Sequence, residues 1–434
     1  MQVGTPPQKM NVLVDTGSSN FAIACSPDPS IKTFFHTDDS SSYTSDGRTV
    51  KVPYTQGKWE GPVGQDMVRM SSLKNVSAVE SYIACITTSD QFFINGSHWE
   101  GILGLAYSEI ARPDNSVEPF FDTLVRERDV PNLFSMQLCG TLDKNKQTDV
   151  SMGGSMVIGA IDPELYKGEI FYTPLRKEWY YEVVVTDIQV EGHSLAMDCK
   201  EYNFDKTIVD SGTTNLRLPT KVFTQLVESI KMKTLLADKD PPPDEFWSGS
   251  SVLCWSTGVT PWDEFPSISI HLAKTNNSTF SLVLSPQQYL RAVGEEYDPS
   301  AQEDCFKFAV APSITGMVLG AVLMEGFYVI FDRENQQIGF AQSSCNVRNP
   351  KGVISRVEGP FTTHSNVQDC AYIKPENNQS TMITVAYVLA GVCGACMIPL
   401  ILMLVQWIWQ KIQKQRNSQD DTNTLIADEE DNNG

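Results

Sequence analysis

The sequence predicts a mainly β protein with two similar lobes around one cleft, followed by a single transmembrane helix. Three observations predict this organisation. A short apolar run that leads into an Asp-containing turn occurs twice, at residues 12–20 and 207–215. Short apolar runs separated by Gly and Pro dominate both halves, as is typical of strands. Near the C-terminus, residues 382–405 carry no charge and are numerous enough to cross a bilayer as a helix.

Composition narrows the functional class. The 434 residues include 33 basic and 53 acidic side chains, for a net charge of −20, which disfavours non-specific binding to nucleic acid. Hydrophobic residues at 41% and charged residues at 20% are typical of a folded chain. The five histidines are isolated from one another, so the sequence indicates no histidine-based metal site, and we expect no metal or cofactor.

The repeated motif carries the candidate chemistry. Residues 15–18 read Asp-Thr-Gly-Ser and residues 210–213 read Asp-Ser-Gly-Thr, and each is followed by a hydroxyl residue and Asn. Glycine at the third position allows a tight turn, so each Asp is expected at the end of a strand. The shared context makes a chance match implausible and predicts two homologous lobes.

Two aspartates that meet in one cleft have a specific chemistry. Asp15 and Asp210 at hydrogen-bond distance cannot both ionise readily, so one pKa rises and the pair shares a proton. The ionised member can take a proton from water, while the protonated member donates to a peptide carbonyl oxygen. This predicts hydrolysis at acid pH without a covalent intermediate. The alternative is a pair of structural aspartates that cap turns.

Each half also contains an apolar pair followed by glycine, Ile-Leu-Gly at 102–104 and Val-Leu-Gly at 318–320. The pattern predicts a strand whose glycine lies close to another backbone. Helical periodicity is confined to short stripes, formed by Phe120, Phe121, Leu124 and Val125 and by Val222, Phe223, Leu226, Val227 and Ile230.

These motifs make the chain, from residue 1 to near residue 350, similar to the pepsin-like aspartic proteases. Longer runs at 92–107, 178–181 and 324–328, together with the single span, resemble the membrane-anchored beta-secretases, or memapsins. The resemblance implies a bilobal pepsin-like fold and an aspartic endopeptidase with Asp15 and Asp210 as its catalytic pair.

The resemblance also implies a flap at residues 52–59, a hairpin that closes over substrate and excludes water. Tyr54 matches the flap tyrosine and Trp59 its hydrogen-bonding support. Taken alone, Tyr54 would be an ordinary strand tyrosine. The flap residues expected to bind substrate are Tyr54, Thr55, Gln56 and Gly57.

Five further positions receive roles from the resemblance. Thr16 and Ser211 match residues that brace the two lobes beneath the dyad. Ser18 and Thr213 match residues of the substrate site that hydrogen-bond the outer carboxylate oxygens. Arg217 matches a cleft arginine, where a guanidinium would favour acidic or polar substrate side chains. The alternative for Arg217 is a surface arginine near a strand end.

Eight of the ten cysteines are scattered between Cys25 and Cys370, which suggests four disulfides and an oxidising compartment. The alternative is eight buried thiols in a cytosolic protein. Spacing alone leaves roughly a hundred connectivities. The resemblance implies Cys139–Cys345, Cys199–Cys370 and Cys254–Cys305. Cys25 and Cys85 depart from the family pattern and are either a fourth bridge or two free buried thiols.

Residues 382–405 predict a transmembrane helix about 36 Å long, which exceeds a hydrocarbon core of about 30 Å. A buried core helix is the alternative. Lys411, Lys414 and Arg416 follow, so the positive-inside rule makes that end cytosolic. The preceding 381 residues then face the lumen or the exterior. On that side, glycosylation sequons begin at Asn75, Asn95, Asn276 and Asn378.

The chain is therefore expected to have five parts. These are a first lobe at 1–155, a second lobe at 156–350, a stalk at 351–381, the transmembrane helix at 382–405, and a disordered cytosolic tail at 406–434. The tail contains an acidic dileucine-like sorting signal, which predicts endocytic adaptors as partners and residence in the Golgi, endosomes and the cell surface. Its residues are Asp421, Leu425 and Ile426.

Three functional hypotheses follow. The first is a single-pass type I membrane endopeptidase that cuts other single-pass membrane proteins. The second is a receptor ectodomain on a protease fold, although Asp15, Asp210 and Tyr54 are all present. The third follows from the start of the chain, which has no signal-like segment. We expect a fragment or processed form without the family's signal, prosegment and first strand, and a truncated isoform that regulates the full-length enzyme is one reading.

Overall fold

The computed structural model divides the chain into two compact units, Met1–Tyr372 and Ile373–Gly434. The first unit contains both halves of the duplication, and the second contains the apolar helix. The structure describes all residues except 55–56, 140–152, 235–240, 257, 261, 294–302, 346–354, 364–365, 374–378 and 431–434, and it describes only the backbone at 379–382 and 417–430.

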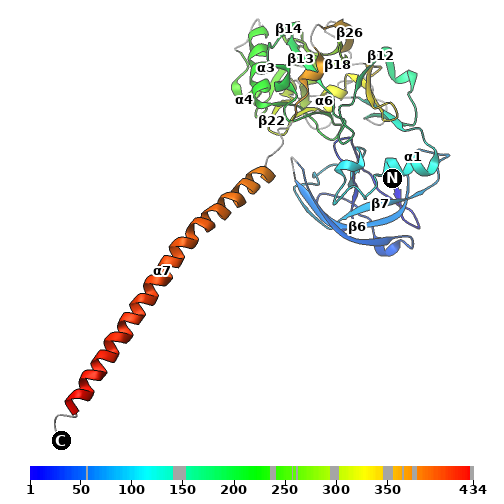
Figure 1. Ribbon diagram of the computed structural model, residues 1–434. Helices are drawn as coiled ribbons and strands as arrows, with labels where there is room; N and C mark the ends of the chain where they lie inside the picture. Colours follow the sequence, from blue (N-terminus) through cyan, green and yellow to red (C-terminus); the bar gives the residue numbers. More distant parts are fainter. Residues whose placement is uncertain are drawn as a thin grey trace. The chain divides into compact units, whose positions relative to one another are not determined.

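The first half folds mainly into one nine-stranded sheet (Figure 1). Its order is β2-β1-β6-β7-β4-β9-β3, and β5 and β8 both pair with β6. The β5–β6 hairpin carries the expected flap. The strands are β1 (Gln2–Val3), β2 (Gln8–Lys9), β3 (Leu13–Asp15), β4 (Phe21–Ala24), β5 (Thr44–Pro53), β6 (Lys58–Arg69), β7 (Val79–Ile86), β8 (Thr88–Asp90) and β9 (Gly101–Gly104).

A five-stranded sheet joins the two halves in the order β11-β10-β24-β25-β12. Phe134 on β10 and Phe331 on β24 are opposite each other in the antiparallel register, and their rings stack with centroids 4.8 Å apart. The lobe boundary expected between residues 155 and 156 falls inside β11, so this sheet is shared. Its strands are β10 (Leu133–Leu138), β11 (Gly154–Ile158), β12 (Tyr166–Pro174), β24 (Phe327–Asp332) and β25 (Gln337–Ser343).

The second half contributes three further sheets, in the orders β14-β13-β18-β19-β26, β15-β23-β16-β22 and β17-β21-β20. The four-stranded sheet leads directly into Asp210. The strands are β13 (Val185–Val190), β14 (His193–Ser194), β15 (Thr207–Val209), β16 (Leu216–Pro219), β17 (Leu253–Ser256), β18 (Ile268–Thr275), β19 (Ser278–Leu284), β20 (Leu290–Val293), β21 (Glu303–Phe308), β22 (Val310–Ser313), β23 (Met317–Leu319) and β26 (Arg356–Thr362).

The duplication in sequence is also a duplication in structure. β3 runs parallel to β9, where Asp15 pairs with Gly104, and β15 runs parallel to β23. A Cβ at Gly104 would lie 2.6 Å from the backbone nitrogen of Asn20, and a Cβ at Gly320 would collide with the carbonyl oxygen of Asn215. The predicted close approach of both glycines to a second backbone is confirmed, and that backbone belongs to the equivalent Asn in each lobe.

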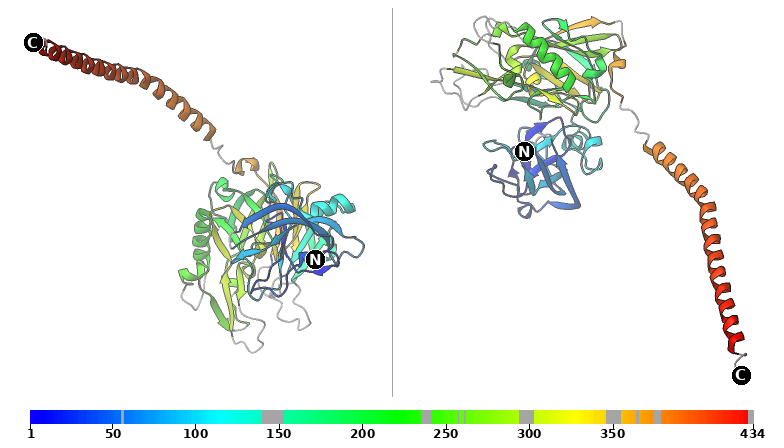
Figure 2. Two further views of the ribbon diagram at one scale, coloured as in Figure 1. Left: turned by 90° about the horizontal axis from the view of Figure 1, so that it is seen from below. Right: turned by 90° about the vertical axis from the view of Figure 1, so that its left-hand side faces the viewer.

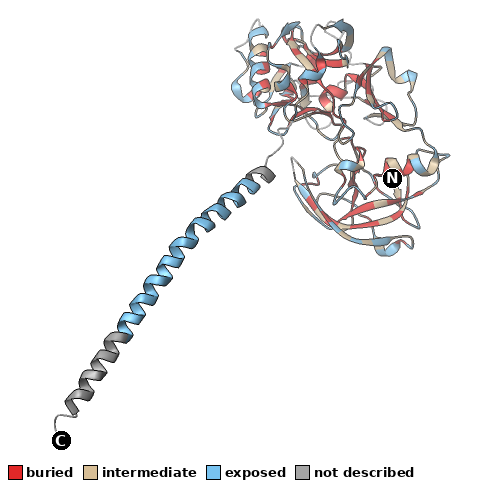
Figure 3. Ribbon diagram, in the orientation of Figure 1, coloured by how far each residue is buried: buried red, intermediate tan, exposed pale blue. Residues whose placement is uncertain are grey.

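Both predicted helical stripes form helices whose apolar face is buried. α1 (Phe120–Arg128) packs on β7, and α3 (Thr220–Lys233) packs on β16, β22 and β13 (Figure 2). Buried segments follow the strands of both halves (Figure 3). The shorter helices are α2 (Cys199–Tyr202), α4 (Asp244–Trp247), α5 (Pro286–Tyr289) and α6 (Ala321–Met324), with 3-10 turns η1 (Thr37–Asp39), η2 (Ser108–Ile110), η3 (Pro163–Leu165), η4 (Trp262–Glu264) and η5 (Val367–Cys370).

The compact unit extends into the segment expected to be a stalk. β26 (Arg356–Thr362) pairs antiparallel with β19, and the disulfide from Cys199 to Cys370 ties η5 to the same lobe. The edge of β19 offers unpaired backbone groups, and β26 satisfies them. Residues 356–372 are therefore part of the folded unit.

In the second unit, α7 (Gln379–Glu430) contains the segment Ile383–Arg416, within which a stretch of 18 residues has a mean hydropathy of 2.6. Within the described part of the chain it is the one helix that is long and apolar enough to cross a membrane. The helical backbone continues to Glu430, where we expected a disordered tail. Residues 406–416 contain no Gly and no Pro and are mostly good helix formers, which explains the continuation past 405.

Candidate active site

Asp15 and Asp210 occupy equivalent places at the ends of equivalent strands. Asp15 is the last residue of β3, and Asp210 directly follows β15. Leu105 N donates to Asp15 O at 2.8 Å, and Asp210 N donates to Leu319 O at 3.1 Å, so each Asp is bonded to the neighbouring parallel strand. Both side chains are buried, with 4% and 7% of their surface exposed.

The two carboxylates are held by the same pair of donors. Asp15 Oδ1 accepts from Gly17 N at 2.8 Å, and its Oδ2 accepts from Ser18 Oγ at 2.5 Å. Asp210 accepts from the backbone nitrogen two residues later at 2.8 Å and from Thr213 Oγ1 at 2.6 Å. Ser18 and Thr213 therefore orient the carboxylates as the resemblance implied, and each Asp is fixed in one plane.

The glycine of each motif makes room for the carboxylate of the other lobe. A Cβ at Gly17 would lie 2.5 Å from Oδ1 of Asp210, and a Cβ at Gly212 would overlap the carboxylate of Asp15. Neither glycine has a positive φ, so the backbone conformation does not demand glycine. The turn, which we expected to require glycine, is therefore not the main reason for glycine at these positions. The main reason is that each glycine lies where the aspartate of the other lobe approaches, so a Cβ has no room.

The environment raises the pKa of Asp15. Burial is the largest cause, and the negative charge of Asp210 is the second. The hydrogen bonds from Ser18 and Gly17 act in the opposite direction, because they favour the ionised carboxylate. A hydrogen bond between the two aspartates also favours the protonated form of Asp15. The site therefore stabilises a pair that shares one proton.

Thr16 and Ser211 directly follow the two aspartates in the chain. Thr16 and Ser211 bond to each other across the two motifs, as the resemblance implied for the brace between the lobes. Thr16 is fully buried.

Tyr54 lies at the end of β5, where the flap hairpin turns. Its backbone nitrogen donates to Gly57 O at 3.0 Å, and its hydroxyl accepts from Trp59 Nε1 at 3.4 Å. Burial raises the pKa of Tyr54, and the charges of Asp15 and Asp210 add to that shift, so the hydroxyl lies within electrostatic reach of the dyad. Two other expected flap residues, Thr55 and Gln56, lie outside the described residues.

Arg217 lies on β16, and its Nη2 donates to Pro312 O at 3.4 Å. In the register, Arg217 is opposite Val318, and Val318 is opposite Ile208, so these three side chains share one face of the sheet. Arg217 is half-buried, and its role in the cleft stays a prediction.

Tyr180 is a residue of the site that sequence reasoning did not assign. Burial raises its pKa, the nearby Arg112 lowers it, and Asp210 and Asp15 both raise it. Because the charges of both aspartates act on the pKa of Tyr180, its hydroxyl lies within electrostatic reach of the dyad. Adjacent residues connect the two lobes, because Tyr107 N donates to Trp179 O at 3.1 Å. The only sequence signal was the run 178–181, which was used for the resemblance and not for a role.

Four disulfides form, which settles the alternatives left by the sequence. The three implied pairings are present, and Cys25 and Cys85 form a fourth bridge across 60 residues instead of two free thiols. Within the described residues, Cys254, Cys305 and Glu303 are the one cluster with the composition of a metal site. The two cysteines are joined to each other, so they offer no thiolate ligands.

The remaining expected sites lie on the surface or outside the described residues. Asn75, Asn95 and Asn276 are exposed, as a modified asparagine must be, whereas Asn378 is not among the described residues. The side chains of Asp421, Leu425 and Ile426 are also outside the described set.

A bilobal β fold in which two motif aspartates meet at buried, hydrogen-bonded positions defines an aspartic protease. The chain belongs to the eukaryotic aspartyl protease family, whose model matches residues 1–343. It is similar to the Beta-secretase of Strongylocentrotus purpuratus, with 46% identity over 450 residues that cover 99% of this chain and 82% of that protein.

Two further relatives have lower identity to the chain. Cathepsin E of Aquarana catesbeiana is 28% identical over 345 residues, covering 79% of this chain and 78% of its own. Cathepsin D of Dictyostelium discoideum is 28% identical over 349 residues, covering 78% and 81%. The chain is thus a beta-secretase-like aspartic endopeptidase of the pepsin family, with one candidate membrane helix.

Proposed function

We propose that this protein is a membrane-anchored endopeptidase that cuts luminal or extracellular segments of other membrane proteins at acid pH. The observation that carries the proposal is the pair of buried carboxylates, Asp15 and Asp210, each supplied by one lobe and each held by two donors. Their environment keeps one proton between them at a pH where isolated carboxyls would be ionised.

In the proposed mechanism, Asp15 holds the shared proton because burial and Asp210 raise its pKa. The ionised Asp210 takes a proton from a water molecule, whose oxygen attacks the peptide carbonyl carbon, while Asp15 donates its proton to the carbonyl oxygen. Asp210 then gives a proton to the leaving nitrogen, Asp15 recovers one from a hydroxyl of the gem-diol, and the C–N bond breaks. The dyad returns to its one-proton state.

Activity then depends on the dyad as a unit. At low pH both carboxyls are protonated and no base is left, and at high pH both are ionised and no acid is left. The rate should therefore follow a bell-shaped pH profile on the acid side of neutrality. Tyr54 with residues 55–57 would close over the peptide, and Arg217 would contact acidic or polar substrate side chains.

The candidate membrane helix suggests the substrate class. An anchor confines the cleft to the membrane surface, so a substrate anchored in the same bilayer is present at a high effective concentration. Single-pass proteins with an extended segment near the bilayer fit this geometry. We propose the lobes 1–155 and 156–350 as the luminal enzyme and 382–405 as the span.

The compartments follow from the same orientation. Four disulfides require an oxidising lumen, and exposed Asn75, Asn95 and Asn276 would be glycosylated there. Leu425 and Ile426 in the cytosolic tail would bind endocytic adaptors and distribute the protein between Golgi, endosomes and the cell surface. Replacement of both by Ala should shift the protein toward the surface, and an unchanged surface-to-endosome ratio would reject the signal.

The decisive experiment places the full chain in vesicles and supplies one peptide sequence in two forms. One form is anchored in the same vesicles by a transmembrane helix, and the other is soluble on the side of the membrane that the protease lobes face. We expect cleavage of both at acid pH, with faster cleavage of the anchored form at equal total amount. Equal rates would reject the membrane-substrate proposal while leaving the endopeptidase intact. An Asp210→Asn chain is the matched control and should cleave neither form.

A further inference from the structure

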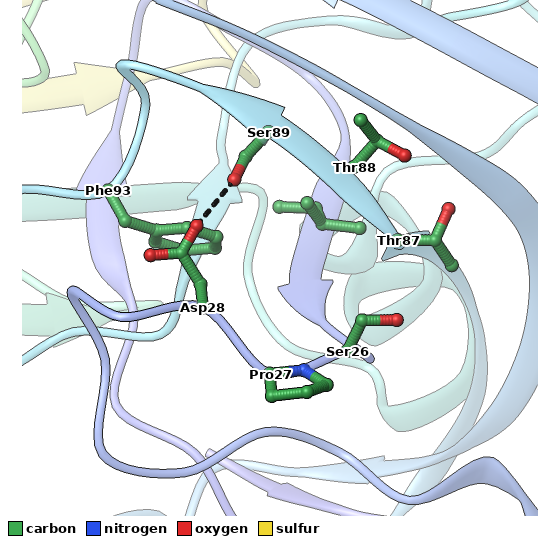
Figure 4. A pocket seen from close by; sticks show the side chains of 8 residues that line it. Ser26, Pro27, Asp28, Thr87, Thr88, Ser89 and Phe93 are labelled. Carbon is green, nitrogen blue, oxygen red and sulfur yellow. Dashed lines mark hydrogen bonds between the residues drawn. The ribbon is translucent and has the colours of Figure 1, made fainter.

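A pocket of about 230 Å³ in the first lobe lies outside the dyad network (Figure 4). It opens between the loop 26–28, which follows β4, and residues 86–89, which form the end of β7 and the start of β8. Phe93 closes one side. These two segments are distant in sequence, so the contacts across the pocket fix where β8 lies.

One side-chain hydrogen bond crosses this pocket. Ser89 Oγ donates to Asp28 Oδ2 at 2.8 Å, and Figure 4 shows it as the dashed line. The other carboxylate oxygen, Oδ1, accepts from Ser30 N at 2.8 Å, which holds Asp28 in its own loop. Asp28 is thus bonded through Oδ1 to its own loop and through Oδ2 to β8. Burial acts to raise the pKa of Asp28, but the hydrogen bonds from Ser30 and Ser89 outweigh it, so the pKa is lowered.

β8 lies beside β6, one of the two strands of the flap hairpin, in the same sheet. In the antiparallel pairing of β8 with β6, Ser89 is opposite Trp59, and Asp90 is opposite Lys58. Trp59 is 1% exposed, and its indole nitrogen donates to the hydroxyl of Tyr54. The path from Asp28 to Tyr54 therefore has only two intermediates, Ser89 and Trp59, joined by one strand pairing.

The residues just after β8 contact Tyr54 and Gly57 of the flap hairpin. Gly57 has φ +80°, and a Cβ there would collide with Gln91 O, so the two backbones are in close contact. Gln91 itself has φ 51°, a conformation that a non-glycine residue adopts rarely and that often marks a functional constraint. The ring of Phe92 lies against Tyr54, with centroids 5.4 Å apart. The position of β8 thus determines both contacts.

The Cys25–Cys85 bridge ties the same two segments together. Cys25 N also donates to Ile86 O at 2.9 Å. Asp28 follows Cys25 by three residues, and Ser89 follows Cys85 by four. The disulfide and the hydrogen bond therefore link the same two segments at two successive points. The bridge fixes the end of β7, and the hydrogen bond fixes β8 itself.

We propose that Asp28 and Ser89 are positioning residues for the flap, and that their hydrogen bond sets the place of Tyr54 over the substrate by holding β8 in its pairing beside Trp59. The inference rests on the proposed role of the flap in the endopeptidase. The competing interpretation is that Asp28 only caps its own turn through Ser30.

The two interpretations predict different kinetics. A flap that is held less firmly closes less readily over the bound peptide in both the ground state and the transition state. Loss of such uniform binding raises KM and leaves kcat nearly unchanged. If Asp28 only capped its own turn, its removal would lower thermal stability without raising KM relative to kcat.

The test compares peptide cleavage at one acid pH by full-length chains in membranes. We expect Ser89→Ala and Asp28→Ala each to raise KM by about fivefold with kcat within about twofold. Asp28→Ala also removes the bond from Ser30 N, so the double variant should resemble Asp28→Ala, because Ser89 then has no bond to Asp28 left to lose. Ser89→Thr keeps the hydroxyl and should restore the original KM, since the pocket has room for a methyl group. Thr88→Ala, on the same strand, is the control and should change nothing.

Hydrogen exchange supplies a second readout for variants with altered stability. Backbone amides of residues 58–60 should exchange faster in Ser89→Ala and in Asp28→Ala, but not in Thr88→Ala. Unchanged KM and exchange in the Ser89 and Asp28 variants, while Asp210→Asn abolishes cleavage, would overturn this inference and leave the endopeptidase standing. Cleavage that survives Asp210→Asn would instead overturn the proposed function.

Discussion

Thr16 and Ser211 exchange hydrogen bonds between equivalent positions of the two lobes. Ser211 N donates to Thr16 Oγ1 at 2.9 Å, and Thr16 N donates to Ser211 Oγ at 3.1 Å. Each hydroxyl also donates to the carbonyl oxygen just before the other lobe's aspartate, Thr16 Oγ1 to Val209 O at 3.0 Å and Ser211 Oγ to Val14 O at 2.7 Å. This closed set of four bonds fixes the distance between Asp15 and Asp210.

Thr16→Val should destabilise the protein and misplace the dyad. The substitution keeps the shape but leaves Ser211 N and Val209 O without their buried partner, which costs about 1–3 kcal/mol for each unsatisfied group. We expect a lower free energy of unfolding and a fall in kcat larger than the change in KM. Thr16→Ser keeps the hydroxyl and is the control. Wild-type kcat in Thr16→Val would show that the brace does not position the aspartates.

Asp15→Asn should increase stability near neutral pH. The pKa of Asp15 is raised in the folded state, so between its ordinary value of about 3.9 and the raised value the folded state binds more protons than the unfolded state. Stability therefore falls as the pH rises through that window. Asparagine cannot ionise and should flatten this part of the curve. The measurement is the stability of both proteins at several pH values from acid to neutral. The same dependence of stability on pH in both proteins would contradict the raised pKa of Asp15.

Removal of the Cys25–Cys85 bridge should lower stability without loss of the fold. The bridge closes a segment of 60 residues, and the chain-entropy model gives about 4 kcal/mol for a loop of that length. The double Cys25→Ala, Cys85→Ala variant is compared with the unsubstituted chain by denaturant unfolding under oxidising conditions. An unchanged midpoint would mean that the bridge is strained or that the unfolded chain is already compact.

Arg217→Leu should change specificity more than overall activity. A well-formed charge-assisted contact is worth roughly 1.5–3 kcal/mol, which is about ten- to a hundredfold in relative kcat/KM. Peptides with an acidic side chain near the scissile bond should lose this advantage, whereas all-apolar peptides should be cut at nearly the original rate. The measurement is a peptide library profiled with both proteins at one acid pH. Identical profiles would place Arg217 outside the substrate site.

The motifs predicted the dyad, and the resemblance added Ser18 and Thr213 as donors, because these contacts lie within four residues of sequence. The donation by the glycine nitrogens was not predicted. Gly17 and Ser18 bond the Asp that precedes them, and the second lobe repeats the arrangement. What the motifs could not give is the reason for the glycine, because the carboxylate that excludes a Cβ at Gly17 comes from Asp210, far away in the sequence.

Contacts between distant segments explain the other differences. The residues of β26 were expected in a stalk, but they pair with the edge of β19, a strand far away in the sequence. Tyr180 was left without a role because its neighbours in the sequence do not show that the charges of Asp15 and Asp210 reach it. Cys25 and Cys85 could be paired only once β4 and β7 were seen to be parallel neighbours.

The central claim is that Asp15 and Asp210 act as one catalytic unit that hydrolyses peptide bonds. The most direct test is kcat/KM for a peptide substrate at the acid optimum, measured for the full chain and for Asp15→Asn and Asp210→Asn. Because neither carboxyl can work without the other, we predict that each substitution reduces kcat/KM by at least about a thousandfold. Activity within about tenfold of the unsubstituted chain in either variant would contradict the account.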